Sequence, residues 1–266
     1  MLLPIRGSQE LFVQRIIIVL LLIGLIGVYV TNNKGVTQIN PPVQHPPYYI
    51  RPLKTRGELP AYLNELKCEV GAELGVQTGL NALGILKGCK TCRKLYLVDT
   101  WTQSTNYKDT ANLDSKRQES LFQQAQHTLA PFANRTVFLR GRTDEMVKKV
   151  FDDSLDFIYL DARHDYCAVA EDLRLWWPKL KRGGLLAGHD FVKDTDLHDG
   201  QDWSLCEDGR VVHGAVQRAV EEFAERHQLI ISVMYREQFA NSYMMRKPFD
   251  ENESNDEKQS NNMKMA

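Results

Sequence analysis

Short apolar runs alternate with longer segments of helical spacing through the middle of the chain. Residues 155–160 form a nearly unbroken apolar run, which is typical of a strand buried on both faces of a parallel sheet. Apolar residues then recur at helical spacing over 169–180. We expect Gly183 and Gly184 to end this helix and a second strand to begin at 185–187. The pattern therefore predicts a strand–helix–strand unit.

The same pattern continues on both sides of this unit. Further strands are predicted over 69–74, 94–98, 136–139, 229–234 and 241–246, and further helices over 61–66, 80–86, 116–129, 143–150 and 214–227. Alternating strands and helices favour a doubly wound, mostly parallel Rossmann-like α/β sheet with a mixed C-terminal edge. Two polar segments, 101–112 and 191–212, are expected as loops, and the length of the second suits a loop over a binding cleft.

The N-terminal part has a different pattern. Residues 16–30, which follow a flank at 1–15, are uncharged and almost entirely aliphatic, although they fall short of the ~20 residues that span a bilayer. A cleaved signal peptide and a buried helix are the alternatives. No small-x-small cleavage site follows the run, and a proline-rich segment does, so we expect a retained transmembrane anchor. Arg6 and Arg15 precede it, which favours a domain on the lumenal side of the membrane.

The remaining boundaries follow from composition. Six of the ten prolines lie within 31–60, which predicts an extended stem. Residues 249–266 are rich in Asn, Glu, Asp, Lys and Ser and are expected to be disordered. The folded domain is therefore placed at 61–248. If it lies in the lumen of the endoplasmic reticulum or Golgi, Asn134 and Asn252 are glycosylation acceptors.

Charge and cysteine content narrow the classes of function. The net charge is −1 without a basic block, so no nucleic-acid partner is expected. Cys89 and Cys92 form a CxxC without a second pair, which disfavours a structural zinc site. The five cysteines leave at least one thiol unpaired within the chain.

A glycine turn follows the first strand of the predicted domain. It runs from Glu73 to Gly79, ELGVQTG, and glycines at such a turn let backbone approach a ligand closely. The turn lacks the G-x-G-x-x-G of dinucleotide sites, which counts against a nicotinamide-dependent oxidoreductase. Asp99 ends the next strand, where a carboxylate can accept hydrogen bonds from both hydroxyls of a ribose. The alternative is that Asp99 caps the following helix.

Ionisable residues follow the next pair of neighbouring strands. Asp161, His164, Asp165, His189 and Asp190 should meet at one edge of the sheet, because the carboxyl ends of parallel strands lie side by side. Carboxylates so close repel unless a cation or a proton lies between them. Oxygen ligands suit Mg²⁺, whereas a histidine ligand favours Mn²⁺ or Fe²⁺. A neutral His164 could act as a base. The alternative is that both aspartates only cap loops.

Taken together, these segments resemble the class I S-adenosylmethionine-dependent methyltransferases. The branch they resemble is that of small-molecule O-methyltransferases related to macrocin O-methyltransferase. The resemblance covers about 68–248 and rests on ELGVQTG, LVDTW, LDARHDY, DLRLWWPKLKRGGLLAGHDF, AVQRAVEEF and SYMMRKP, in that order.

This resemblance implies S-adenosylmethionine as the cofactor. The cofactor-binding residues that it implies are Glu73, Gly75, Gly79, Asp99 and Thr143. Of these, Glu73 and the two glycines would shape the methionine end of the site, and Asp99 would hold the ribose. Arg142 departs from the family, whose members often carry an acidic residue there for the adenine contact.

The resemblance also implies a reaction centre. Asp161 and Asp190 match the aspartates with which some relatives bind Mg²⁺ or another divalent cation, and His189 would be a further ligand. We expect methyl transfer to a hydroxyl of a small molecule or glycan, with Asp161 and His164 as catalytic residues. The alternatives are a membrane-tethered Rossmann-like binding domain without turnover and a nicotinamide-dependent oxidoreductase.

Overall fold

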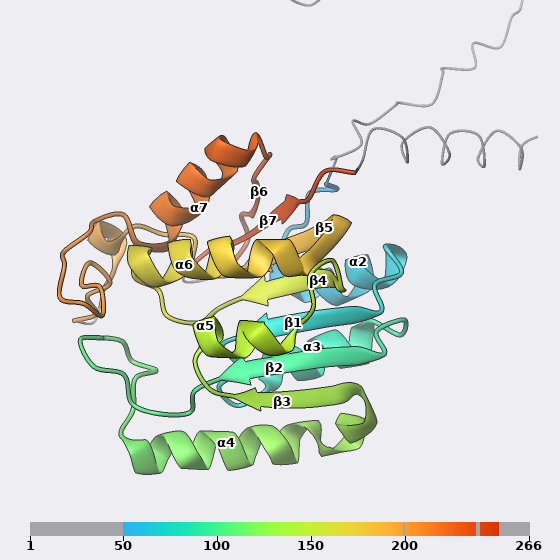
Figure 1. The fold of residues 1–266 in the computed structure, drawn as a ribbon, viewed down its shortest axis with the longest axis horizontal. Helices are drawn as coiled ribbons and strands as arrows, with labels where there is room; N and C mark the ends of the chain where they lie inside the picture. Colours follow the sequence, from blue (N-terminus) through green and yellow to red (C-terminus); the bar gives the residue numbers. More distant parts are fainter. Residues whose placement is uncertain (1–49, 199, 238–239, 250–266) are drawn as a thin grey trace, which may run out of the picture. The chain divides into compact units, whose positions relative to one another are not determined.

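The computed structural model describes residues 50–198, 200–237 and 240–249. A seven-stranded sheet in the order β3-β2-β1-β4-β5-β7-β6 forms its centre (Figure 1). Strands β1 to β5 pair in parallel, and β7 is antiparallel to both β5 and β6. The predicted mostly parallel, doubly wound sheet with a mixed C-terminal edge is therefore confirmed.

The helices and strands have the following bounds. The strands are β1 (Val70–Leu74), β2 (Lys94–Asp99), β3 (Thr136–Arg140), β4 (Leu155–Leu160), β5 (Leu180–Gly188), β6 (Ser232–Met234) and β7 (Ser242–Arg246). The α-helices are α2 (Leu59–Glu65), α3 (Leu80–Gly88), α4 (Ser115–Leu129), α5 (Thr143–Met146), α6 (Tyr166–Trp176) and α7 (Ala215–His227). Short 3₁₀ helices lie at Arg56–Glu58, Ala130–Arg135, Val147–Lys149, Trp177–Lys179 and Asp194–Asp196.

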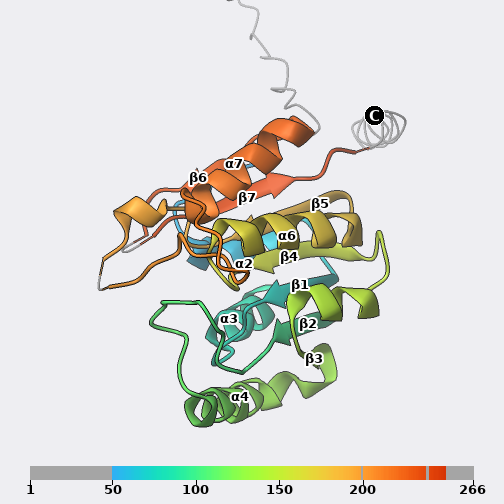
Figure 2. The same cartoon turned by 60° about the vertical axis from the view of Figure 1, so that its left-hand side comes forward.

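Helices cover both faces of the sheet, as Figure 2 shows from a second direction. Helices α2, α3 and α4 share one apolar cluster with strand residues such as Phe157 and Tyr159. Helices α6 and α7 share the other cluster with Ile158 and Leu160. Consecutive residues of β4 thus point to opposite faces, and both faces are buried, which explains its unbroken apolar run.

Strand β5 begins earlier than the sequence predicts. Helix α6 ends at Trp176 and one 3₁₀ turn follows, so β5 already starts at Leu180. Gly183 and Gly184 lie inside the strand, where its register against β4 shifts, and Gly183 has a φ of +70°. The prediction that these glycines end the helix is wrong, because they form a bulge within the strand.

The apolar core extends to the first described residues. Ile50, Leu53 and Leu59 are buried, although they lie in the range whose prolines predict a stem. Within the described ranges, no helix has the length and apolar character needed to cross a membrane. The predicted anchor at 16–30 and nearly all of the predicted tail lie outside those ranges.

Candidate functional site

A cleft of about 1480 Å³ opens at the carboxyl ends of the parallel strands. Its lining contains every cofactor-binding, catalytic and metal-binding residue predicted from the sequence except Gly79, which directly precedes α3. The topology therefore brings the predicted site residues together. Their contacts decide what each of them can do.

The turn after β1 packs directly against the end of β4. Gly75 has a φ of +86°, and a Cβ atom there would come within 1.8 Å of the backbone oxygen of Asp161. Gly79 also has a positive φ, +77°, where the chain enters α3. Both positions favour glycine, and at Gly75 the missing side chain lets the turn pack directly against the backbone after β4.

Glu73 places a buried carboxyl group beside this turn. Its side chain accepts a hydrogen bond of 3.3 Å from Asn81 through Oε1, whereas Oε2 has no partner within the described part of the chain. Burial raises the pKa of Glu73 well above its usual range, against the opposing effect of the Asn81 hydrogen bond. A buried carboxyl oxygen without a partner fits a ligand ammonium group, such as that of a methionine moiety.

Asp99 lines the cleft, but its carboxylate is occupied by backbone amides. Oδ2 accepts hydrogen bonds of 2.9 Å from both Val76 and Gln77, and Oδ1 accepts one of 2.8 Å from Trp101. These hydrogen bonds hold the β1 turn against the end of β2, with the Asp99 carboxylate accepting from backbone amides of both segments. A carboxylate has about four acceptor positions, so one remains for a ribose hydroxyl. The ribose contact stays a prediction.

Asp161, His164 and Asp190 form a compact cluster at the ends of β4 and β5. His164 Nε2 lies 3.4 Å from Asp161 Oδ1 and 3.1 Å from Asp190 Oδ2. One ligand atom from each residue fits within 4.8 Å of the others. Two carboxylate oxygens and one imidazole nitrogen form a donor set that suits Mg²⁺ only in part and suits Mn²⁺ or Fe²⁺ better.

His189 lies beside this cluster. Its Nδ1 is 3.1 Å from Asp190 Oδ1, and its Nε2 is 3.8 Å from Glu237 Oε2. The geometry thus groups His164, which the sequence assigned as a base, with the two aspartates. His189, which the sequence assigned as a metal ligand, contacts Asp190 and can fix the orientation of its carboxylate, and its role as a ligand stays a prediction.

The other side of His164 faces two loops. Nδ1 lies 3.2 Å from Asp109 Oδ2 and 2.9 Å from the Tyr107 hydroxyl, and the Trp203 ring is 4.4 Å from the imidazole. The Trp203 indole N–H donates to the same Asp109 oxygen at 2.7 Å. The sequence did not identify these three residues, because only the polar composition of their loops was readable.

His164 is strongly held in its charged form. Burial opposes the charge, but Asp190, Asp109 and Asp161 outweigh it and raise the pKa of His164 to about 10. At neutral pH the imidazole in this arrangement is therefore protonated. This differs from the neutral imidazole that the predicted base role requires, so His164 can act as a base only after it loses this proton.

Comparison with known proteins agrees with this geometry. A family model described as a methyltransferase domain matches residues 72–191. A "putative caffeoyl-CoA O-methyltransferase" from Staphylococcus aureus is 14% identical over 75% of this chain and 86% of that chain, with a TM-score of 0.52. Cofactor-bound Rv0187 from MTB is 11% identical over 73% and 80%, with a TM-score of 0.50. No curated protein matches the sequence.

This is a class I methyltransferase fold. The resemblance stated from the sequence segments is confirmed at that level. In this methyltransferase fold, the turn after β1 and the end of β4 meet at Gly75, so the predicted cofactor site and the acidic cluster share one cleft.

The turn between β3 and α5 forms another part of the cleft. Arg142 there donates through Nη1 to both carboxylate oxygens of Glu207, at 2.9 and 2.8 Å, and through Nε to Asp144 at 3.0 Å. Thr143 is hydrogen-bonded to Asp172, a buried carboxyl group that also lines the cleft. The sequence missed Asp172, although a charged residue on the apolar face of α6 was a readable signal.

Asp172→Asn is expected to stabilise the folded domain at pH 8 by roughly 2–4 kcal/mol. Burial raises the pKa of Asp172 to about 7, from an ordinary value near 3.9. The folded state then binds the proton more tightly than the unfolded state. The stability that wild type gains from protonated Asp172 is therefore complete below about pH 4 and lost as pH rises through 7, whereas an asparagine does not ionise. Urea unfolding at pH 4 to 8, with exposed Asp152→Asn as the control, tests this. Equal pH profiles for wild type and Asp172→Asn contradict it.

Proposed function

We propose that this protein transfers the methyl group of S-adenosylmethionine to a hydroxyl oxygen of a small molecule or glycan. The observation that carries the proposal is that the glycine turn after β1 and the Asp161–His164–Asp190 cluster line one cleft. Donor and acceptor bound there would be held next to each other. S-adenosylmethionine supplies an activated methyl group, and a divalent cation lowers the pKa of an acceptor hydroxyl.

The residues of the β1 turn would bind the cofactor. Glu73 would accept a hydrogen bond from the cofactor ammonium group through its unpartnered Oε2. The turn at Gly75 would lie beside the methionine end, in the position that its close packing on the Asp161 backbone gives it. Asp99 would hold the turn in place and offer its remaining acceptor position to the ribose. Thr143 would lie at the adenine end.

Asp161 and Asp190 would hold the cation, with His164 as the third ligand. The pKa of His164, raised by these aspartates, means that a protonated imidazole would balance their negative charge when no cation is bound. The same charge balance favours a cation in that place, because two carboxylates so close repel each other without a positive charge between them. Asp109 and Tyr107 would orient the imidazole from its other side.

Incubation with labelled S-adenosylmethionine and candidate extracts tests the proposed function. We expect one methylated product and an equal amount of S-adenosylhomocysteine, both reduced by a chelator and restored by Mg²⁺ or Mn²⁺. Calorimetry with S-adenosylmethionine and with nicotinamide cofactors is the matching binding experiment. Failure to bind S-adenosylmethionine excludes the proposal, and binding without turnover on any extract favours a binding domain.

We also propose that residues 16–30 anchor the protein and that the domain lies in the lumen of the endoplasmic reticulum or Golgi. The disulfides Cys89–Cys92 and Cys167–Cys206 support an oxidising compartment. Asn134 is exposed and available for glycosylation. Glycosidase sensitivity at Asn134 is the expected result. Digestion of the domain by protease added to sealed microsomes contradicts the proposal.

A further inference from the structure

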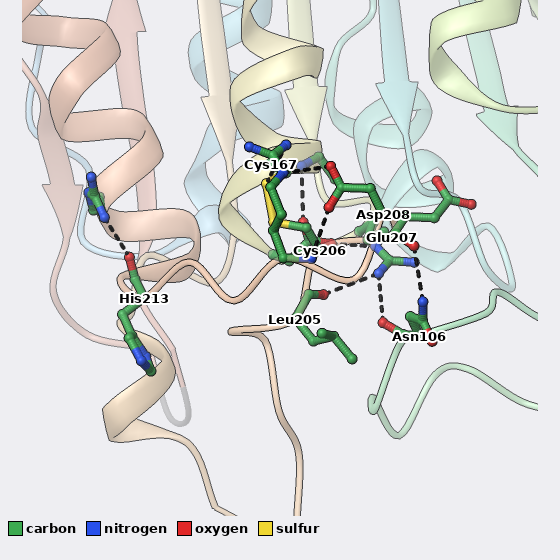
Figure 3. The surroundings of a disulfide bond; sticks show 12 residues. Asn106, Cys167, Leu205, Cys206, Glu207, Asp208 and His213 are labelled. Carbon is green, nitrogen blue, oxygen red and sulfur yellow. Dashed lines mark hydrogen bonds and ion pairs between the residues drawn. A yellow bond between two sulfur atoms is a disulfide. The ribbon is translucent and has the colours of Figure 1, made fainter.

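The segment 204–212 forms a small hairpin beside the cleft. The Cys206 amide donates to the Arg210 oxygen at 2.9 Å, and the Val212 amide donates to the Ser204 oxygen at 2.7 Å. Leu205 and Val211 form an antiparallel bridge within it. The disulfide Cys167–Cys206 joins this hairpin to the first turn of α6 (Figure 3).

The first turn of α6, which carries Cys167, is held by buried contacts. Asp165 is completely buried, caps the helix by accepting a hydrogen bond of 3.2 Å from the Ala168 amide, and pairs with Arg163. Cys167 lies in the first turn of the helix, between the capping residue Asp165 and Ala168. The covalent bond therefore connects the hairpin to a rigid part of the fold.

Arg163 joins the hairpin to the loop after β2. Its guanidinium donates to the backbone oxygens of Thr105 and Asn106 at 3.0 and 2.8 Å, and to that of Leu205 at 3.3 Å. Asn106 Nδ2 in turn donates to the Glu207 oxygen at 3.0 Å. The two loops are thus one connected cover, and the disulfide is its covalent link to α6.

Besides Tyr107 and Asp109 of the loop after β2, the cover reaches the site through Trp203 and Glu207. Trp203, which precedes the hairpin by one residue, packs on His164 and donates to Asp109, and only 4% of it is exposed. Glu207, at the hairpin tip, pairs with Arg142. That ion pair is about half exposed and screened by solvent, so it holds the hairpin only weakly. The disulfide is the covalent restraint on the segment that follows Trp203, beside the hydrogen bonds from Arg163 and Asn106.

We propose that the Cys167–Cys206 disulfide is a positioning bond for the reaction centre. It holds the hairpin against α6, and the hairpin keeps Trp203 packed on His164. The consequence for catalysis rests on the proposed function, whereas the position of Trp203 does not. A dithiol reductant gives two electrons and two protons to the bond, forms its own disulfide and leaves Cys167 and Cys206 as thiols. Trp203 should then lose its fixed place.

The Cys167→Ser/Cys206→Ser double variant tests the proposal without reductant. Trypsin cleavage after Arg210 is expected to be at least about tenfold faster than in wild type, since cleavage needs local opening of the hairpin. The proton resonances of the His164 ring, assigned with His164→Gln, are expected to move because the Trp203 ring no longer lies over the imidazole. Cys89→Ala/Cys92→Ala removes the other disulfide and should match wild type in both measurements.

Reduction and reoxidation of the wild-type protein supply the second arm. Reductant should shift the His164 resonances of wild type and of the Cys89/Cys92 variant, reoxidation should restore them, and the Cys167/Cys206 variant should not respond. With an identified acceptor, the variant should show an acceptor KM raised about tenfold at an unchanged affinity for S-adenosylhomocysteine. Wild-type cleavage rates and wild-type His164 resonances in the folded double variant overturn the proposal, whether or not the protein transfers methyl groups.

Discussion

Asp161→Asn and Asp190→Asn are each expected to lower kcat/KM for methyl transfer by about 10²–10⁴. Each substitution removes one of the two carboxylates that can hold a cation, and an amide is a weaker ligand without charge. Asp161 follows β4 and Asp190 follows β5, and the parallel pairing of these two strands brings the aspartates together. Their losses should not add fully in the double variant, because both act on one site.

Transfer of the labelled methyl group and Mn²⁺ binding by electron paramagnetic resonance measure this effect together. Asp152→Asn is the matched control, because this aspartate is exposed and pairs only with Lys179 at 2.6 Å among the described residues. It should leave both measurements unchanged. Full activity of either cleft variant, or of wild type in excess chelator, contradicts a metal-assisted reaction.

Gly75→Ala is expected to destabilise the domain by about 3 kcal/mol or more. Two costs combine at this position. A φ of +86° is strained for any residue with a Cβ, and that atom would lie 1.8 Å from the Asp161 backbone oxygen. Relief of the clash requires the β1 turn to move away from the end of β4, so the affinity for S-adenosylhomocysteine should fall as well.

Urea unfolding of Gly75→Ala beside Gly84→Ala measures this cost. Gly84 lies within α3, and a Cβ there meets nothing within 4 Å. Alanine at position 84 should stabilise the helix by about 0.5–1 kcal/mol. The prediction fails if Gly75→Ala unfolds at the same urea concentration as wild type.

The centre of the sheet was predictable because strands such as β4 are buried on both faces. Residues 155–160 carry apolar side chains toward two different helix layers, so the run stands out in the sequence and its predicted bounds match β4. The start of β5 was not predictable in the same way. Glycine is common at helix ends, and only the pairing with β4 shows that Gly183 and Gly184 form a bulge within β5.

The site was predictable where topology alone determines it. Asp161 and Asp190 follow strands that are neighbours in a doubly wound sheet, and the structure places both beside His164. Tyr107 and Trp203 lie on loops whose course depends on tertiary contacts, so no periodicity indicated them. The pairing of Cys167 with Cys206 was likewise open, because cysteine spacing does not determine connectivity.

The segment before α2 affects how the domain can be produced as a fragment. Leu53 is fully buried, the Arg56 amide donates to Glu237 at 2.6 Å, and the Arg236 amide donates to the Lys54 oxygen at 3.1 Å. A fragment trimmed to residue 61 would remove Leu53 and Leu59 from the core and leave an apolar surface open to aggregation. It would also lose Arg56, which lines the cleft. Expression should therefore begin ahead of Ile50.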